Sequence, residues 1–172
     1  MFLRKLFHEG VEAPLLRTSI FFLILFAAVA VRVSNYEEVF KPFSGHLNFL
    51  DPDSYYQLRR LAHFITHFPE VMRFDPFLDW PYGSRVDWMP GLMWVVGLPL
   101  KLLGVSSYDG LETAVSFLMI GFGLLQMLLL YFLIRRVIPD KRFWLFGLFL
   151  GAILPSMVRY SCLGQVDHLS LI

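Results

Sequence analysis

The chain has 172 residues, of which 56% are hydrophobic and 17% aromatic, and its formal net charge is +1. A soluble domain is about 45–50% apolar, so this excess favours a membrane protein. The near-neutral charge argues against a nucleic-acid partner, and the single cysteine, Cys162, excludes an internal disulfide.

The first predicted element is a membrane span over about 15–33. Residues 18–31 carry no charge, and roughly 20 apolar residues suffice to cross the hydrocarbon layer. We expect Arg32, near the end of this span, to reach the membrane surface. A cleaved signal peptide is the alternative, because Ala28-Val29-Ala30 resembles a processing site. The apolar run is long for a signal peptide, however, and the leader contains two acidic residues.

Residues 34–112 form a long polar region, which we expect to be the first external loop. Asp51 and Pro52 are typical of a helix start, and we expect this helix to stop at Pro69. If Asp51 turns back to cap the helix, Asp53 is free to point elsewhere, because residues two apart lie on different sides of a helix.

Two further features of the same loop have simple interpretations. His63 and His67 have the spacing of metal ligands on a helix, but no third ligand accompanies them, so we interpret them as an ordinary polar face. Gly91–Leu103 is apolar but short and interrupted by Pro99, which predicts an interfacial segment that does not cross the membrane. Three tryptophans are then expected at headgroup depth: Trp80, Trp88 and Trp94.

Two more spans are predicted over about 113–134 and 143–158. The loop 135–142 between them is basic, with Arg135, Arg136, Lys141 and Arg142. A second external loop, 159–168, follows, and Leu169–Ile172 begins a fourth apolar run.

The basic residues predict the topology. Positive charge near membrane ends favours the cytoplasmic side, and both the leader and the loop 135–142 are basic. Two membrane spans separate the leader from the loop 135–142, so both lie on the cytoplasmic side, provided that the interfacial segment 91–103 does not cross the membrane. The two external loops then share the opposite side, so Asp53 and Asp167 are expected on one face of the membrane.

Two carboxylates beside an apolar wall indicate a site for a hard divalent cation, which commonly shares its coordination with phosphate oxygens. A phosphate-bearing lipid is the substrate that would lie at this depth. Three arginines are candidates for holding its phosphate oxygens: Arg59, Arg60 and Arg159. The plain alternative is a set of solvated acids, which are common just outside a membrane.

The order of these segments resembles the N-terminal part of the catalytic subunit of oligosaccharyltransferases, which are GT-C class membrane glycosyltransferases. Asp53-Ser54-Tyr55-Tyr56 is similar to the acidic motif of the family's first loop, and Gly164-Gln165-Val166-Asp167-His168 to its second-loop motif. Two turn segments resemble segments seen in many members: Trp80-Pro81-Tyr82-Gly83 and Trp88-Met89-Pro90-Gly91. The resemblance implies an all-α integral membrane fold with three transmembrane helices, a long first loop containing helices, and the start of a fourth span.

The resemblance also implies a reaction. An oligosaccharide is transferred from a polyprenyl-linked phosphate or diphosphate to asparagine in Asn-x-Ser/Thr of an acceptor protein, on the extracytoplasmic side of the cell (inner) membrane. Asp53, Asp167 and Arg159 would be catalytic, and Asp53, Asp167 and His168 would bind Mg²⁺ or Mn²⁺. Leu169 departs from the pattern, because the family has a metal ligand there, so His168 would have to replace it from one position earlier.

Three alternatives stay open. Another GT-C enzyme, transferring sugars to protein hydroxyls or to lipid A, would also have an acid in its first loop, although the Asp167 motif favours an oligosaccharyltransferase. A transporter would carry ionisable groups at mid-membrane depth, which the two cleanest spans lack. A purely structural membrane subunit is the third alternative, because a fold does not by itself imply an enzymatic activity. Because the family has a further glutamate and a soluble domain beyond position 172, we expect this chain to be an N-terminal part, inactive by itself.

Overall fold

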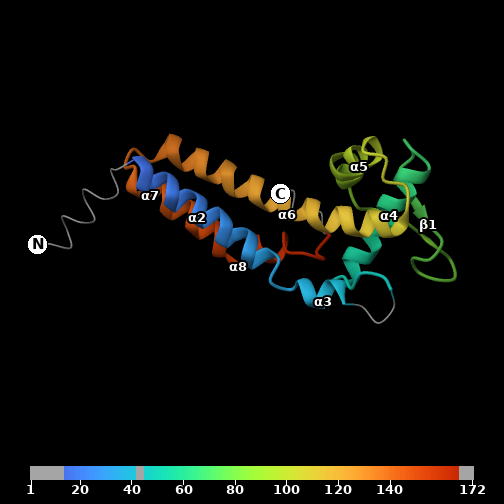
Figure 1. Cartoon of the computed structure of the whole chain (residues 1–172). Coiled ribbons are helices and arrows are strands. Elements are labelled where there is room, and N and C mark those ends of the chain that lie inside the picture. Colours follow the sequence, from blue (N-terminus) through green and yellow to red (C-terminus); the bar gives the residue numbers. More distant parts are fainter. Residues whose placement is uncertain (1–13, 42–44, 167–172) are drawn as a thin grey trace, which may run out of the picture.

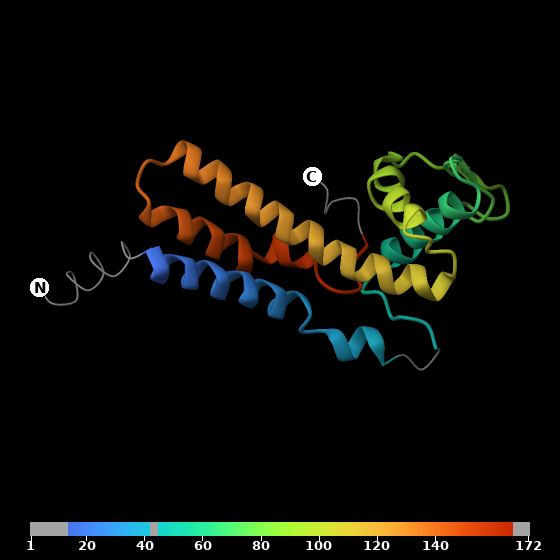
Figure 2. The same ribbon diagram turned by 45° about the horizontal axis from the view of Figure 1, so that its top comes forward.

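A computed structural model of the chain describes residues 14–41 and 45–166. Its elements, in order, are α2 (Pro14–Arg32), α3 (Tyr36–Phe40), α4 (Pro52–Thr66), β1 (Phe74–Asp75), β2 (Ser84–Arg85), η1 (Met93–Gly97), α5 (Leu98–Leu102), α6 (Tyr108–Val137), α7 (Arg142–Ile153) and α8 (Pro155–Arg159). The helices α2, α6 and α7 lie side by side in an elongated bundle (Figure 1). The elements α4, α5 and the strands gather around one end of α6 (Figure 2). A helical bundle therefore carries a smaller subdomain at one end.

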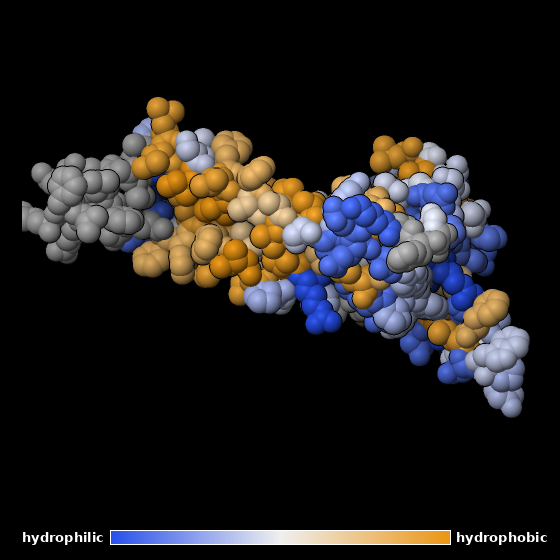
Figure 3. All heavy atoms as spheres, turned by 60° about the horizontal axis from the view of Figure 1, so that its bottom comes forward, coloured by the Kyte–Doolittle hydropathy of each residue, from blue (hydrophilic) through white to orange (hydrophobic). Residues whose placement is uncertain are grey.

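Two helices of the described residues are long and apolar enough to cross a membrane. They are α2, with 19 residues, and α6, with 30. At 1.5 Å per residue, α2 extends over about 29 Å, which matches the hydrocarbon layer. Large apolar side chains of the bundle stay exposed, among them Phe22, Phe26, Leu129, Phe132 and Phe149. The space-filling view shows an apolar surface over the bundle and a hydrophilic one over the subdomain (Figure 3). This distribution fits a bundle surrounded by lipid.

The predicted third span, 143–158, is divided into two helices. α7 has only 12 residues and ends at Ile153, and five-residue α8 begins at Pro155. The residue before a proline is disfavoured in the helical region, and Leu154 accordingly has φ −58° and ψ 122°. A continuous third helix is therefore wrong, and the count of three spans stays a prediction.

The helix predicted to begin after Asp51 is confirmed as α4. Asp51 is its N-cap, with an extended backbone (φ −149°, ψ 161°), and its Oδ1 accepts a hydrogen bond from Ser54 N at 2.7 Å. Pro52 occupies the first helical position, where a missing N–H leaves nothing unpaired. The helix ends at Thr66, slightly before the stop expected at Pro69.

The segment 91–103 forms η1, a π-helical stretch, and α5, which pack on α4. The ten residues of η1 and α5 extend over only about 15 Å, half of the hydrocarbon thickness, so they are too short to cross. Gly97 allows the close approach, because a Cβ there would lie 2.7 Å from Phe64 Cδ1. The core between η1, α4 and α6 is apolar and contains Leu58, Leu61, Phe64, Leu92, Met93, Val96 and Val115.

The small hairpin of β1 and β2 is an addition to the predicted all-α fold. The two strands are antiparallel, with Phe74 opposite Arg85 and Asp75 opposite Ser84. Each has two residues, too few for a period-two pattern to show in the sequence. The fold is otherwise helical, as expected.

Candidate active site

The start of α4 is bonded to the segment 164–166, which forms the first three residues of the second-loop motif. Three hydrogen bonds join them: Val166 N to Ser54 Oγ (2.8 Å), Leu50 N to Gly164 O (3.1 Å), and Gln165 Nε2 to Asp51 Oδ2. We call these three bonds the 50–54/164–166 latch. Ser54 and Val166 are fully buried, so their bond is shielded from water. The latch brings together two segments that are far apart in the sequence.

Asp53 lies between two latch residues but is exposed. Among the described residues, no hydrogen bond or ion pair involves its carboxylate, whereas Asp51 both caps α4 and binds Gln165. The two acids therefore have the separate roles that the sequence predicts: Asp51 is structural and Asp53 is available.

Asp167 and His168 lie outside the described residues, and so does Leu169. The structure therefore does not test their predicted roles as metal ligands. The described chain stops at Val166, whose N–H donates to Ser54.

The end of α2 holds the segment 161–163 in place. Arg32 is fully buried and makes two hydrogen bonds with this segment: its Nε donates to Ser161 Oγ (2.8 Å), and its O accepts from Leu163 N (2.9 Å). Its Nη1 also donates to Ala28 O in α2 (3.1 Å) and to Ala152 O in α7 (3.4 Å). The expectation that Arg32 reaches the membrane surface is therefore wrong. Oxygens of Ser161, Ala28 and Ala152 accept from its Nε and Nη1, while Nη2 has no partner among the described residues, so the guanidinium is only partly satisfied inside the protein.

Arg159 is exposed at the end of α8, where its carbonyl accepts a hydrogen bond from Cys162 Sγ at 3.2 Å. The described contacts do not connect its guanidinium to Asp53, so its catalytic role stays a prediction. Burial raises the pKa of the neighbouring Cys162 thiol, which therefore stays protonated at neutral pH.

Arg59 and Arg60 have structural partners instead of a free diphosphate-binding position. Arg60 is buried, and its guanidinium donates to Gln57 Oε1 at 2.9 Å and to Trp88 O at 3.1 Å. Burial lowers the pKa of Arg60. Arg59 donates to the fully buried Asp75 at 2.9 Å. Both arginines thus fasten the segment 75–89 to α4. Burial excludes Arg60 from holding phosphate oxygens in this arrangement, whereas this role stays a prediction for the partly exposed Arg59.

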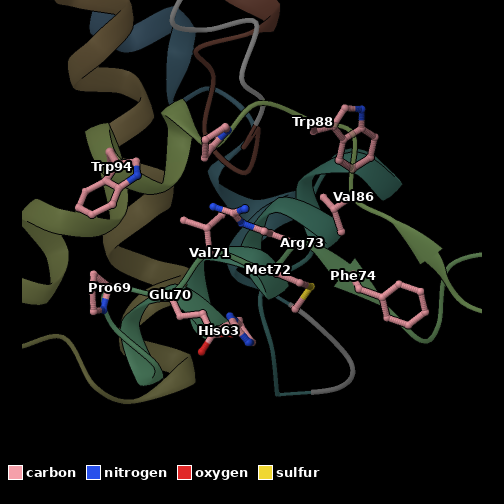
Figure 4. Close-up of a pocket in the computed structure, with 11 residues that line it drawn as sticks. His63, Pro69, Glu70, Val71, Met72, Arg73, Phe74, Val86, Trp88 and Trp94 are labelled. Atoms are coloured by element: carbon pink, nitrogen blue, oxygen red, sulfur yellow. The ribbon is translucent and has the colours of Figure 1, made fainter.

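A cavity of about 650 Å³ lies beside the C-terminal half of α4 (Figure 4). Its lining combines indole rings with ionisable groups and includes His63, Glu70, Arg73, Trp88 and Trp94. His63 is ten residues from Asp53, or about 15 Å along the helix, so this cavity is separate from the latch. The rings of His63 and His67 stack at 4.5 Å, and in the described part of the chain no third ligand joins them.

One group of potential ligands was missed by sequence reasoning. Ligand atoms of His46, Asp109 and Glu112 lie within 4.8 Å of one another. Glu112 is buried and accepts a hydrogen bond from Leu47 N at 3.1 Å, while the other two side chains are exposed. The group therefore fastens the segment 45–47 to the start of α6. Asp109 and Glu112 are three residues apart on α6 and share a helix face, but His46 is too distant in the sequence for a spacing rule to connect it to them.

Comparison with known proteins adds an independent finding. The family model described as "Oligosaccharyl transferase STT3, N-terminal" matches residues 20–172. Dolichyl-phosphooligosaccharide-protein glycotransferase 2 of Archaeoglobus fulgidus is 29% identical over 152 residues, which are 87% of this chain and 24% of that protein. Glycotransferase 3 of the same organism is 32% identical over 147 residues, which are 85% of this chain and 17% of that protein.

Solved structures give the same picture. The archaeal oligosaccharyltransferase AglB from A. fulgidus, in complex with an inhibitory peptide and a dolichol-phosphate, has a TM-score of 0.76 at 29% identity, covering 88% of this chain and 17% of that one. The A. fulgidus enzyme tethered to an acceptor peptide containing the NVT sequon has a TM-score of 0.78 at 29% identity, and the match covers 94% of this chain and 19% of that one. A complex with Zn and sulfate has a TM-score of 0.75 at 29% identity, covering 87% and 18%. This chain spans a quarter or less of the length of these relatives.

Proposed function

Because the chain belongs to the oligosaccharyl transferase STT3 family, we propose that it supplies the first two carboxylates of an N-glycosylation enzyme. This enzyme transfers an oligosaccharide from a polyprenyl-linked phosphate or diphosphate to asparagine in Asn-x-Ser/Thr of an acceptor protein. The solved relatives support both substrates, since one is a complex with a dolichol-phosphate and another holds a peptide with the NVT sequon.

The observation that carries the proposal is the bond from Val166 N to Ser54 Oγ. Asp53 directly precedes Ser54, and Asp167 directly follows Val166. The two acids are thus sequence neighbours of the two residues that this buried bond joins, although one acid belongs to the first loop and the other to the second. We infer from this that both carboxylates bind one shared cation, since a hard divalent cation takes several oxygen ligands.

The charge distribution supports an extracytoplasmic site in a multi-pass protein of the cell membrane. The beginnings of α2 and α7 and the end of α6 lie together at the end of the bundle away from α4 (Figure 1), and four bases stand at these helix ends: Arg17, Arg135, Arg136 and Lys141. Positive residues at membrane ends favour the cytoplasmic side, so the latch and Asp53 would face the other side.

We infer Mg²⁺ or Mn²⁺ as the cofactor. Asp53 fits such an ion, because it offers an exposed oxygen ligand that is unpaired among the described residues. Asp167 would be the second ligand, and His168 would take the place of the ligand missing at Leu169. The complex of a relative with Zn and sulfate supports a site for a divalent cation in this family. Such an ion would stabilise the negative charge of the departing lipid phosphate.

The other residues position these ligands or bind the donor. Asp51, Ser54 and Gln165 hold the two loops together through the latch and leave the Asp53 carboxylate free. Arg159 would bind phosphate oxygens from the exposed end of α8, because its planar guanidinium suits bidentate phosphate contacts.

The test is glycan transfer from a lipid-linked donor to a peptide with Asn-x-Thr, measured on the full-length enzyme. We expect Asp53→Ala to lower the rate at least a hundredfold and EDTA to abolish transfer until Mg²⁺ or Mn²⁺ is restored. Asp87→Ala is the matched control, since Asp87 is another exposed acid of the first loop outside the latch. Unchanged turnover in Asp53→Ala would overturn the proposal.

A further inference from the structure

The bundle has an open cleft at the end opposite the latch. It lies where α2 and α7 begin and α6 ends, and its volume is about 510 Å³. All three helices line it, with Arg17, Phe21, Phe22, Tyr131, Arg135 and Trp144 among the lining residues. The cleft therefore depends on the packed bundle and belongs to no single helix.

Two guanidinium groups lie near one indole ring in this cleft. The Cζ of Arg17 lies 5.3 Å from the centre of the Trp144 ring, and the Cζ of Arg135 lies 4.8 Å from it. The indole itself is held by a hydrogen bond from Trp144 Nε1 to Ile138 O at 2.9 Å. Within the described ranges, neither arginine forms an ion pair with a carboxylate. Two positive charges that line one cleft repel each other, so an anion bound in the cleft would be stabilised.

The surroundings of the cleft are apolar. Phe22 and Phe132, which also line it, are 61% and 57% exposed. The surface of the bundle in Figure 3 is largely apolar. Tryptophan beside arginine at the end of an apolar span is typical of the membrane–water interface. A suitable ligand thus has an anionic head for the two arginines and apolar chains for the exposed phenylalanines.

We propose that this cleft binds the phosphodiester headgroup of an anionic phospholipid, with its acyl chains along α2 and α6. Basic pockets between transmembrane helices bind such headgroups in other membrane proteins. Arginine is well suited to this task, because its fork of N–H donors matches two phosphate oxygens while its plane stays on an aromatic ring. The site is at the opposite end of the bundle from Asp53, so it does not depend on the proposed catalysis.

The experiment measures lipid binding to the purified protein by native mass spectrometry, with phosphatidylglycerol and phosphatidylcholine as probes. We expect phosphatidylglycerol to be retained preferentially. The variant Arg17→Gln/Arg135→Gln should weaken its binding by roughly 25-fold, since each arginine near an anionic group contributes about a fivefold preference. The control Arg136→Gln/Lys141→Gln removes the same charge from exposed positions that do not line the cleft, and should change binding less than threefold.

A second measurement does not rely on the double variant being folded. Brominated phosphatidylglycerol should quench the fluorescence of the wild-type protein, and Trp144→Phe should reduce that quenching, because the indole lines the cleft. Equal retention of both lipids, equal loss in the control variant, or unchanged quenching in Trp144→Phe would each overturn the proposal. Displacement of the lipid by inorganic phosphate alone would show a free-anion site and overturn it as well.

Discussion

Removing the Ser54 hydroxyl tests whether the latch holds the second loop. In Ser54→Ala the N–H of Val166 loses its acceptor while staying buried, because both residues are fully enclosed. An unsatisfied buried donor costs about 1–3 kcal/mol. The bonds of Asp51 and Leu50 to the same segment are left intact, so we expect local loosening of residues 164–166 without loss of the fold.

Hydrogen–deuterium exchange reports that loosening directly. A destabilisation of about 1–3 kcal/mol should speed exchange of the Val166 amide roughly 5- to 150-fold. Ser107→Ala is the matched control, because Ser107 Oγ accepts a hydrogen bond from Gly110 N at 3.1 Å as the N-cap of α6 but has no bond to the second loop. It should cost about 1 kcal/mol in stability and leave Val166 unaffected. Unchanged exchange of Val166 in Ser54→Ala would refute the role assigned to the latch.

Three further predictions concern the supports of the site. Gly123→Ala should lower thermal stability in detergent, since its methyl group would collide with Ser161. The control Gly121→Ala changes a glycine of α6 that has open space around it, and it should be neutral or stabilising by up to about 1 kcal/mol. Equal effects of the two substitutions would contradict the close packing of Ser161 on α6. Asp75→Ala should lower the free energy of unfolding by about 1–3 kcal/mol, measured by chemical denaturation, because it removes the acceptor for the Phe77 N–H and for the partly exposed Arg59 guanidinium. A variant as stable as the wild type would contradict this pairing. Because burial raises the pKa of Cys162, iodoacetamide should modify this thiol more slowly than a free thiol at pH 7.5, and the rate should rise only at more alkaline pH. The same shift lowers the free energy of unfolding as the pH rises above the usual thiol pKa near 8.5, since the folded state then binds more protons than the unfolded state. The alkylation is measured by mass spectrometry, and a rate as fast as that of a free thiol would contradict the raised pKa.

Local chemistry made α4 predictable. A carboxylate before a proline marks a helix start because capping involves neighbouring backbone groups only, and the separate roles of Asp51 and Asp53 follow from helix geometry. The division of the third predicted span also had a signal in Pro155. It was missed because the apolar run was judged by its length and not by its interior proline.

Long-range bonds were not predictable. Ser161 as the partner of Arg32, and Gln165 as the partner of Asp51, each join residues that no helix or strand period relates. The same holds for Arg60, which looks like a free cation in the sequence but is enclosed by the segment that returns at Trp88. The topology argument predicted which loops share a face, and only the fold shows which atoms meet.

The bonds around the site form one connected path from α2 to α4. Arg32 O accepts from Leu163 N, and Gly164 O accepts from Leu50 N, so the segment between them is held on both sides. Because this path ends at Ser54, the position of Asp53 depends on how α2 holds the segment 161–166, although Asp53 itself has no described hydrogen bond or ion pair with α2. A cation shared by two loops needs both backbones fixed before it binds, since otherwise binding would have to order them at a cost in free energy. The buried bonds beside Asp53 supply that order. We therefore expect the residues next to the acids, and not the acids themselves, to determine how stably the two loops stay together.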